Sequence, residues 1–165
     1  MNQDLRPHSP SLDPNMTLAV DPAVAVSPLT LGRVVVLVHD YDDALAFYGA
    51  AFGARVLFDA PSPSGDRYLH VGFGGEAGGG VWFLRANGEA VARVGRQTGG
   101  EPLAVLYASD VRAAVGRAEA AGAEVVRPIE SADGARFAHV ADLYGNVFVL
   151  VELPAMDGHN DLARG

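Results

Sequence analysis

The chain has 165 residues, enough for one ordinary domain with a single core, since domains cluster near ~100 to 150 residues. Hydrophobic residues make up 49% and charged residues 19%, a balance that excludes wholesale disorder. The 12 basic and 20 acidic residues give a formal charge of −8, which argues against nucleic acid as a partner. The absence of cysteine excludes disulfides, thiolate nucleophiles and Cys-ligated metals. Because no membrane-spanning run or secretory signal is evident, we expect no membrane partner and a cytoplasmic location.

Both ends of the chain differ in composition from its middle. Residues 1–28 contain five prolines and no sustained periodicity, which predicts a disordered, proline-rich arm. A flexible leader is the simplest interpretation of this arm, and a functional arm is the alternative. Residues 155–165 predict a flexible tail, so the folded domain is expected over residues 29–154.

The first half of the domain shows one strand, one helix and three further strands in order. Leu31–Val38 is a β-branched, apolar run that predicts a strand covered on both faces. Asp40 can cap a helix that ends at Gly53. Three more strands are predicted over 55–58, 67–73 and 81–85, separated by turns rich in proline and glycine.

The same order of elements then returns. A strand is predicted over 103–108, a helix from Asp110 to Gly122, and strands over 124–127, 136–140 and 146–151. Direct comparison supports a duplication, because Arg67–Val71 matches Arg136–Val140 at an offset of 69 residues. The sequence therefore predicts an α+β protein with two tandem βαβββ modules, over residues 31–86 and 101–153.

Two motifs in this repeat resemble the vicinal oxygen chelate superfamily, which includes glyoxalase I, extradiol dioxygenases, fosfomycin-resistance enzymes and bleomycin-resistance proteins. One is Val38-His39-Asp40 leading into a helix with Phe47-Tyr48 and Phe52-Gly53; the other is Asp142-Leu143-Tyr144-Gly145-Asn146 before the last strand. The resemblance covers roughly residues 31–153. It implies that the two modules form an eight-stranded cup, with the helices outside and a ligand cavity inside.

The resemblance also implies where a divalent metal would be held, namely by His, Gln or Glu on the first and fourth strands of each module. Counting from the two motifs places these positions at Arg33, Phe83, Leu103 and Val149. None of these side chains, nor their immediate neighbours, supplies a suitable lone pair. We therefore expect no metal and no cofactor.

Strand alternation predicts which side chains face the cup. Arg33 is the most suggestive, because a guanidinium in an apolar cavity requires a carboxylate, a phosphate or a polarised carbonyl. A structural ion pair or a position at the rim is the alternative. Trp82 and Leu84 are expected beneath a helix instead. The predicted ligand-binding residues are Arg33, Tyr68, Phe83, Arg85, Leu103, Tyr107, Phe137 and Val149.

Three residues are candidates for proton transfer: His70, His139 and Tyr107. The alternative is that both histidines are hydrogen-bonded wall residues. The leading hypothesis is a metal-independent protein that binds a small molecule in its cup, resembling the bleomycin-resistance branch. The rival hypotheses are a metal-free enzyme that uses these residues with Arg33 as anchor, and a divalent-metal enzyme of the glyoxalase or dioxygenase type. Whether the protein is an enzyme stays open, as does a homodimer.

Overall fold

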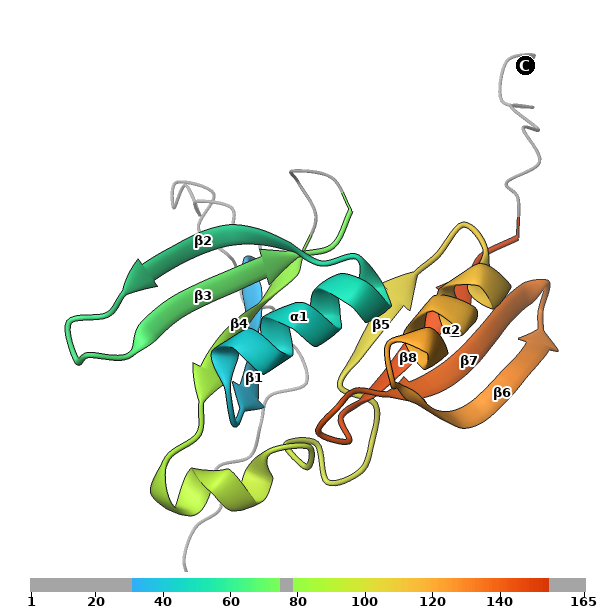
Figure 1. The fold of residues 1–165 in the computed structure, drawn as a ribbon. Coiled ribbons are helices and arrows are strands. Elements are labelled where there is room, and N and C mark those ends of the chain that lie inside the picture. The colour runs from blue at the N-terminus through green and yellow to red at the C-terminus, as the bar shows by residue number, and fades with distance from the viewer. Residues whose placement is uncertain (1–30, 75–78, 155–165) are drawn as a thin grey trace, which may run out of the picture. The chain divides into compact units, whose positions relative to one another are not determined.

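The computed structural model describes residues 31–74 and 79–154, so the predicted arm over 1–28 and tail over 155–165 lie outside the described residues. Two modules follow one another, each a strand, a helix and three strands (Figure 1). The first contains β1 (Arg33–Val38), α1 (Tyr41–Phe52), β2 (Arg55–Pro61), β3 (Arg67–Gly72) and β4 (Gly80–Arg85). The second contains β5 (Ala104–Tyr107), α2 (Val111–Ala120), β6 (Glu124–Ala132), β7 (Ala135–Ala141) and β8 (Val147–Glu152).

The two modules have the same sheet topology. The strand order is β1-β4-β3-β2 in the first sheet and β5-β8-β7-β6 in the second. In each sheet the first strand runs parallel to the fourth, and the remaining neighbours are antiparallel. The predicted α+β fold with tandem βαβββ modules is therefore confirmed. In the described part of the chain the eight strands form two four-stranded sheets rather than one continuous sheet.

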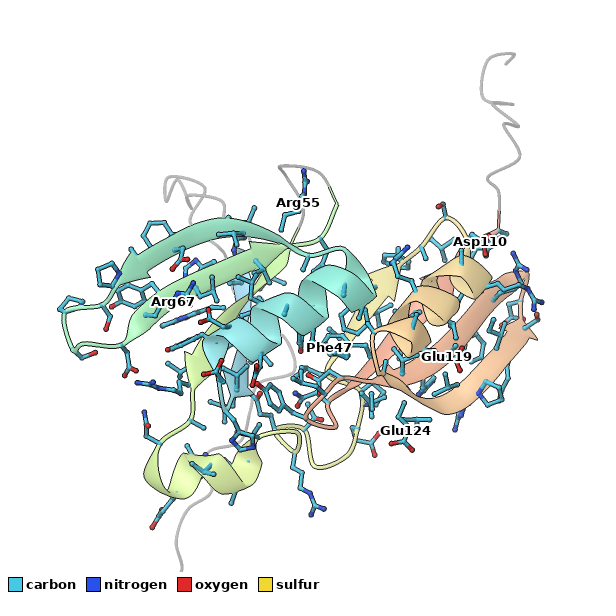
Figure 2. All side chains as sticks on the ribbon, viewed as in Figure 1. Phe47, Arg55, Arg67, Asp110, Glu119 and Glu124 are labelled. Carbon is cyan, nitrogen blue, oxygen red and sulfur yellow. The ribbon has the colours of Figure 1, made fainter. Side chains whose placement is uncertain are left out.

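The two helices begin where the sequence predicts. Asp40 Oδ1 accepts hydrogen bonds from the backbone amides of Asp42 at 2.8 Å and Asp43 at 3.0 Å. Asp110, at the start of α2 (Figure 2), accepts a hydrogen bond from the amide of Ala113 at 3.1 Å. Gly53 ends α1 with a φ of 68°, a left-handed conformation that glycine adopts without strain. Such caps fix where each helix starts and stops over its sheet.

One hydrophobic core fills the space between the helices and the sheets. Tyr48 on α1 is fully buried and its ring contacts Phe83 of β4 at 4.9 Å and Phe148 of β8 at 5.8 Å. Because Phe83 and Phe148 belong to different modules, the tyrosine joins the two halves. Such edge-on aromatic contacts add to the large apolar area that each ring buries. The core therefore extends through both modules.

A buried polar network crosses the same boundary between modules. The Tyr48 hydroxyl donates to Asp142 Oδ2 at 2.7 Å, and Asn146 Nδ2 donates to the same oxygen at 2.9 Å. The amides of Tyr144 and Asn146 donate to Asp142 Oδ1 at 2.9 and 2.8 Å. Burial, followed by the charge of Asp142, raises the pKa of Tyr48 well above its usual value. This satisfied network explains how Asp142 is tolerated in the core.

The structure corrects two predictions about the first sheet. Strand β1 is covered on one face only, because Val35 stays 37% exposed while Val36 and Val38, which point to the opposite face, are fully buried. On β4 the predicted alternation is wrong by one residue, since Phe83 lies buried against α1. Trp82 therefore lies on the opposite face of the sheet rather than beneath the helix.

The connection between the modules contains a 3-10 helix, η1 (Gly88–Arg93), that the sequence did not predict. Gln97, which follows it, accepts a hydrogen bond from the Leu37 amide at 2.6 Å and donates to the Val35 carbonyl at 3.2 Å. The connection thereby binds the free edge of β1. Within the described ranges, no helix is long and apolar enough to cross a membrane.

Candidate ligand-binding face

The face of the first sheet that points away from α1 carries the most suggestive group of side chains in the described residues. We call it the open face. The ladders β1·β4 and β3·β4 pair Val35 with Trp82 and Trp82 with His70, which places all three on the same side. Strand alternation adds their neighbours at every second position. The open face thus consists of Arg33, Val35, Leu37, Phe58, Tyr68, His70, Trp82 and Leu84.

Four of these side chains form a continuous strip of rings. The ring of His70 lies 5.5 Å from that of Phe58 and 5.6 Å from that of Trp82, between centroids. Tyr68 continues the strip, 5.8 Å from Trp82. These separations lie within the range of favourable aromatic pairs. The strip crosses strands β2, β3 and β4, so its geometry is fixed by the sheet.

Two nitrogen donors on the open face are shielded from water without a hydrogen-bond partner among the described residues: Arg33 Nε and Trp82 Nε1. Arg33 Nη1 donates to the Gly32 carbonyl at 2.5 Å, and none of the ion pairs within the described ranges includes Arg33. A buried donor that lacks a partner costs about 1 to 3 kcal/mol. Each such group in a native structure requires an explanation, and an acceptor supplied by a ligand is one.

Gly80 allows the Arg33 side chain to lie across the sheet. The two residues are partners in the β1·β4 ladder. A Cβ atom at Gly80 would lie 2.3 Å from the backbone oxygen of Val71 and 3.2 Å from Arg33 Cδ. The first distance is below any real contact, so β3 and β4 can approach this closely only with glycine here. The position of the guanidinium therefore depends on Gly80.

His70 lies on the same face of the sheet as this cation, across β4 from β1. Burial, followed by the charge of Arg33, lowers the pKa of His70 below its usual value of 6.5. Both causes disfavour the imidazolium ion. The side chain is therefore neutral near pH 7, and one ring nitrogen can accept a proton or a hydrogen bond.

The second sheet carries the other predicted residues. Tyr107 is 72% exposed at the end of β5, and Val149 pairs with His139 across the β7·β8 ladder. The His139 ring contacts Phe137 at 6.4 Å. Leu103 is half-buried and packs against the core just before β5. The ring of His70 contacts those of Phe58 and Trp82, and a cavity shared by His70 and His139 stays a prediction.

Two of the predicted ligand-binding residues in the first sheet do not lie on the open face. Phe83 belongs to the core, as described above, because α1 covers that side of β4. Arg85 turns to the same side, where it pairs with Asp66 at 2.7 Å and lies 5.7 Å above the Tyr41 ring of α1. With Arg67, labelled in Figure 2, it borders a polar depression of about 350 Å³. Arg67 and Arg85 both have carboxylate partners there.

A separate, mostly apolar groove of about 490 Å³ lies between the edges of the two sheets. Its volume is within the range of small-molecule pockets. Arg33 lies beside it, because the guanidinium stem crosses Gly80, which lines the groove. The lining residues are Leu31, Val34, Phe73, Gly74, Gly79, Gly80, Val81, Ala104, Val105, Leu106, Tyr107 and Phe148.

The residues present do not fit the divalent metal of related enzymes. On β1 the position is Arg33, and on β4 the open face offers Trp82 and Leu84. A protonated guanidinium, an indole and an alkyl group supply no metal ligand. Within residues 31–74 and 79–154, no three His, Cys, Asp or Glu side chains are placed to hold a metal ion. The corrected alternation on β4 therefore offers no metal ligand either, and the absence of a metal stays a prediction.

Paired βαβββ modules, each with one helix over one sheet, define the vicinal oxygen chelate class of fold. A model of the Glyoxalase/Bleomycin resistance protein/Dioxygenase superfamily matches residues 30–150. The chain therefore belongs to this superfamily. An uncharacterized protein of Shewanella frigidimarina (strain NCIMB 400) is 30% identical over 123 residues, which cover 73% of this chain and 91% of that protein.

Two solved structures share the fold. That of UcmS2 has a TM-score of 0.65 and 26% identity, and the match covers 76% of this chain and 98% of UcmS2. That of TnmS3, an antibiotic binding protein from Streptomyces sp. CB03234, has a TM-score of 0.63 and 24% identity, and the match covers 77% of this chain and 98% of TnmS3. At this identity, the likeness to TnmS3 establishes the fold alone.

Proposed function

We propose that this protein binds a small organic molecule on the open face, without a metal ion. The observation that carries the proposal is the pair of shielded donors without partners, Arg33 Nε and Trp82 Nε1. A ligand oxygen that accepts from either atom removes a desolvation cost that the free protein bears. The aromatic strip and the adjacent groove supply apolar area, which is the usual composition of a small-molecule site.

A thermal-shift screen of the whole chain tests this proposal. The panel contains aromatic acids, aliphatic acids, amines and neutral rings. A compound that binds the folded state at 100 times its dissociation constant stabilises it by about 2.7 kcal/mol, which raises the melting temperature by about 8 °C. We expect at least one compound to do so, and the shift to disappear in Arg33→Met.

Two outcomes of the screen contradict the proposal. One is that no compound in the panel raises the melting temperature up to millimolar concentration. The other is that the compounds raise the melting temperatures of Arg33→Met and Trp82→Phe as much as that of the unaltered chain, because the ligand then binds elsewhere. The control is Arg112→Met, which removes the same charge from an exposed position on α2 and should leave the shift intact.

A metal-free enzyme is the second candidate, and His70 favours it. Its lowered pKa leaves a neutral imidazole beside the Arg33 cation, an arrangement suited to removing a proton next to a carbonyl that the guanidinium polarises. Exchange of such a proton for deuterium from solvent, followed by NMR on each compound that binds, tests this candidate. Exchange that is lost in His70→Gln would support it, and exchange equal to that in buffer would reject it.

We also propose that two copies of the chain associate. Several large apolar side chains of the described residues are exposed, including Val35, Val105, Tyr107 and Val126. Exposed apolar side chains can contribute to a protein–protein interface, and association would bury them. Light scattering after gel filtration should give twice the chain mass of 17.2 kDa, and a mass of one chain at micromolar concentration would reject the homodimer.

A further inference from the structure

The ring strip of the open face presents several closely spaced aromatic rings to a ligand. Successive ring centroids are 5.5, 5.6 and 5.8 Å apart from Phe58 through His70 and Trp82 to Tyr68, so the strip extends over three strands without an aliphatic interruption. The rings are tilted by 47° to 56° relative to one another. A flat aromatic molecule can place its face or edge against several of these rings at once, whereas a saturated ring cannot use their quadrupoles.

Two polar groups of the open face, the Arg33 guanidinium and the Trp82 indole, only donate hydrogen bonds. Trp82 is at the centre of the strip, and its indole N–H has no partner among the described residues. Arg33 pairs with Gly80, which precedes Trp82 by two residues on the same side of β4, so the cation borders the same strip. Asp59 of β2 and Asp66 of the turn before β3 are paired with Arg67 and Arg85 on the helix side. Among the described residues, the open face therefore carries no competing acidic group.

We infer that the ligand is a planar aromatic anion, whose rings lie on the strip and whose carboxylate or equivalent oxygens accept from Arg33 Nε and Trp82 Nε1. This inference rests on the proposed function and specifies its ligand class. Arginine is suited to the role, because its planar fork of donors matches a carboxylate and stays charged at every physiological pH. The indole fixes the orientation of the ligand at the centre of the strip.

Three soluble probes separate the two parts of the inference: 2-naphthoate, 2-naphthylmethylammonium and cyclohexanecarboxylate. The first is a planar anion, the second a planar cation, and the third an anion without an aromatic ring. Calorimetry on the whole chain should show that 2-naphthoate binds at least tenfold more tightly than either of the others. Because Trp82 is the sole tryptophan, its indole N–H gives one NMR resonance, which 2-naphthoate should shift.

Variants of the protein test the same two contacts of the ligand, with Arg33 and with Trp82. Arg33→Met should weaken 2-naphthoate at least tenfold and bring it level with 2-naphthylmethylammonium. Trp82→Phe, which keeps a ring but removes the N–H, should weaken 2-naphthoate severalfold. Arg112→Met is the matched control and should bind as the unaltered chain does. Circular dichroism of each variant confirms that it is folded.

The outcomes distinguish this inference from the proposed function. Equal affinity for the two naphthalene probes would show that Arg33 is not an anchor, and equal affinity for the two anions would show that the rings are not used. If 2-naphthoate fails to bind while other compounds give thermal shifts that Arg33→Met abolishes, the proposed function stands and the ligand class is wrong. If no compound binds at all, both are wrong.

Discussion

Replacing Arg33 by methionine should stabilise the ligand-free protein. The shielded Nε without a partner costs about 1 to 3 kcal/mol, and methionine fills similar space with an unbranched apolar chain. The substitution also removes the hydrogen bond from Nη1 to the Gly32 carbonyl, which is exposed and contributes about 0.5 to 1 kcal/mol. Taking about 2 kcal/mol for the first effect and about 1 kcal/mol for the second, we expect a net gain of about 1 kcal/mol.

Urea unfolding followed by Trp82 fluorescence measures this difference directly. A gain of about 1 kcal/mol corresponds to a melting temperature about 3 °C higher for a chain of this size. Arg112→Met on the exposed side of α2 should change stability by no more than about 0.5 kcal/mol. If Arg33→Met instead lowers stability by 1 kcal/mol or so, the guanidinium is satisfied in the free protein and the argument from its missing partner is wrong.

Three further changes test the packing that holds the open face in place. Tyr48→Phe removes the buried hydrogen bond to Asp142, so urea unfolding should show a loss of about 1.5 to 3 kcal/mol; a loss below about 0.5 kcal/mol would contradict its role between the modules. Gly80→Ala places a Cβ 2.3 Å from the Val71 backbone oxygen, so the melting temperature measured by calorimetry should fall by several degrees. An unchanged melting temperature would contradict the close approach of β3 and β4. Stability should also fall in acid, because hydrogen bonds and cations lower the pKa of three carboxyls in the folded protein. Each carboxyl stabilises the fold fully at a pH above its pKa in the unfolded chain. This stabilisation is lost as the pH falls through its lower pKa in the folded protein. Urea midpoints that are equal at pH 7 and pH 3 would reject this dependence. The three carboxyls are Asp40, held by the amides of Asp43 and Asp42, Asp59, held by Arg67, and Glu152, held by Arg136 and the amide of Val111.

The modular fold could be predicted because the sequence contains the same pattern of elements twice. The offset of 69 to 70 residues between Asp40 and Asp110, and between the two third strands, relates each element to a copy of itself. The caps at Asp40 and Gly53 act within a few residues, so they can be recognised without tertiary information. The order of elements in the two modules confirms the first prediction, and the hydrogen bonds to Asp40 and the left-handed Gly53 confirm the second.

The faces of the strands were harder to predict, and β4 shows why. Its sequence, Val81-Trp82-Phe83-Leu84-Arg85, is almost entirely apolar, so period-two alternation gives no signal for which side is buried. The glycines that precede it supply no side chain from which to count. On β3 the alternation was informative, and Leu69 and Val71 lie in the core while Tyr68 and His70 do not.

Other features depend on contacts that no local pattern encodes. Gln97 meets the edge of β1 across 60 residues of sequence, and the missing partners of Arg33 and Trp82 follow from burial rather than from residue type. The sequence did indicate Arg33 as an anchor, because the family resemblance identified its position. It gave no reason to place Trp82 beside it.

The most direct test of the proposed site is a crystal structure of the protein with the compound that gives the largest thermal shift. We expect electron density for the ligand over the Trp82 ring, with a ligand oxygen about 3 Å from Arg33 Nε and from Trp82 Nε1. Ligand density confined to the groove between β1 and β5, or to the polar depression beside Tyr41, with both donors still without partners, would contradict it.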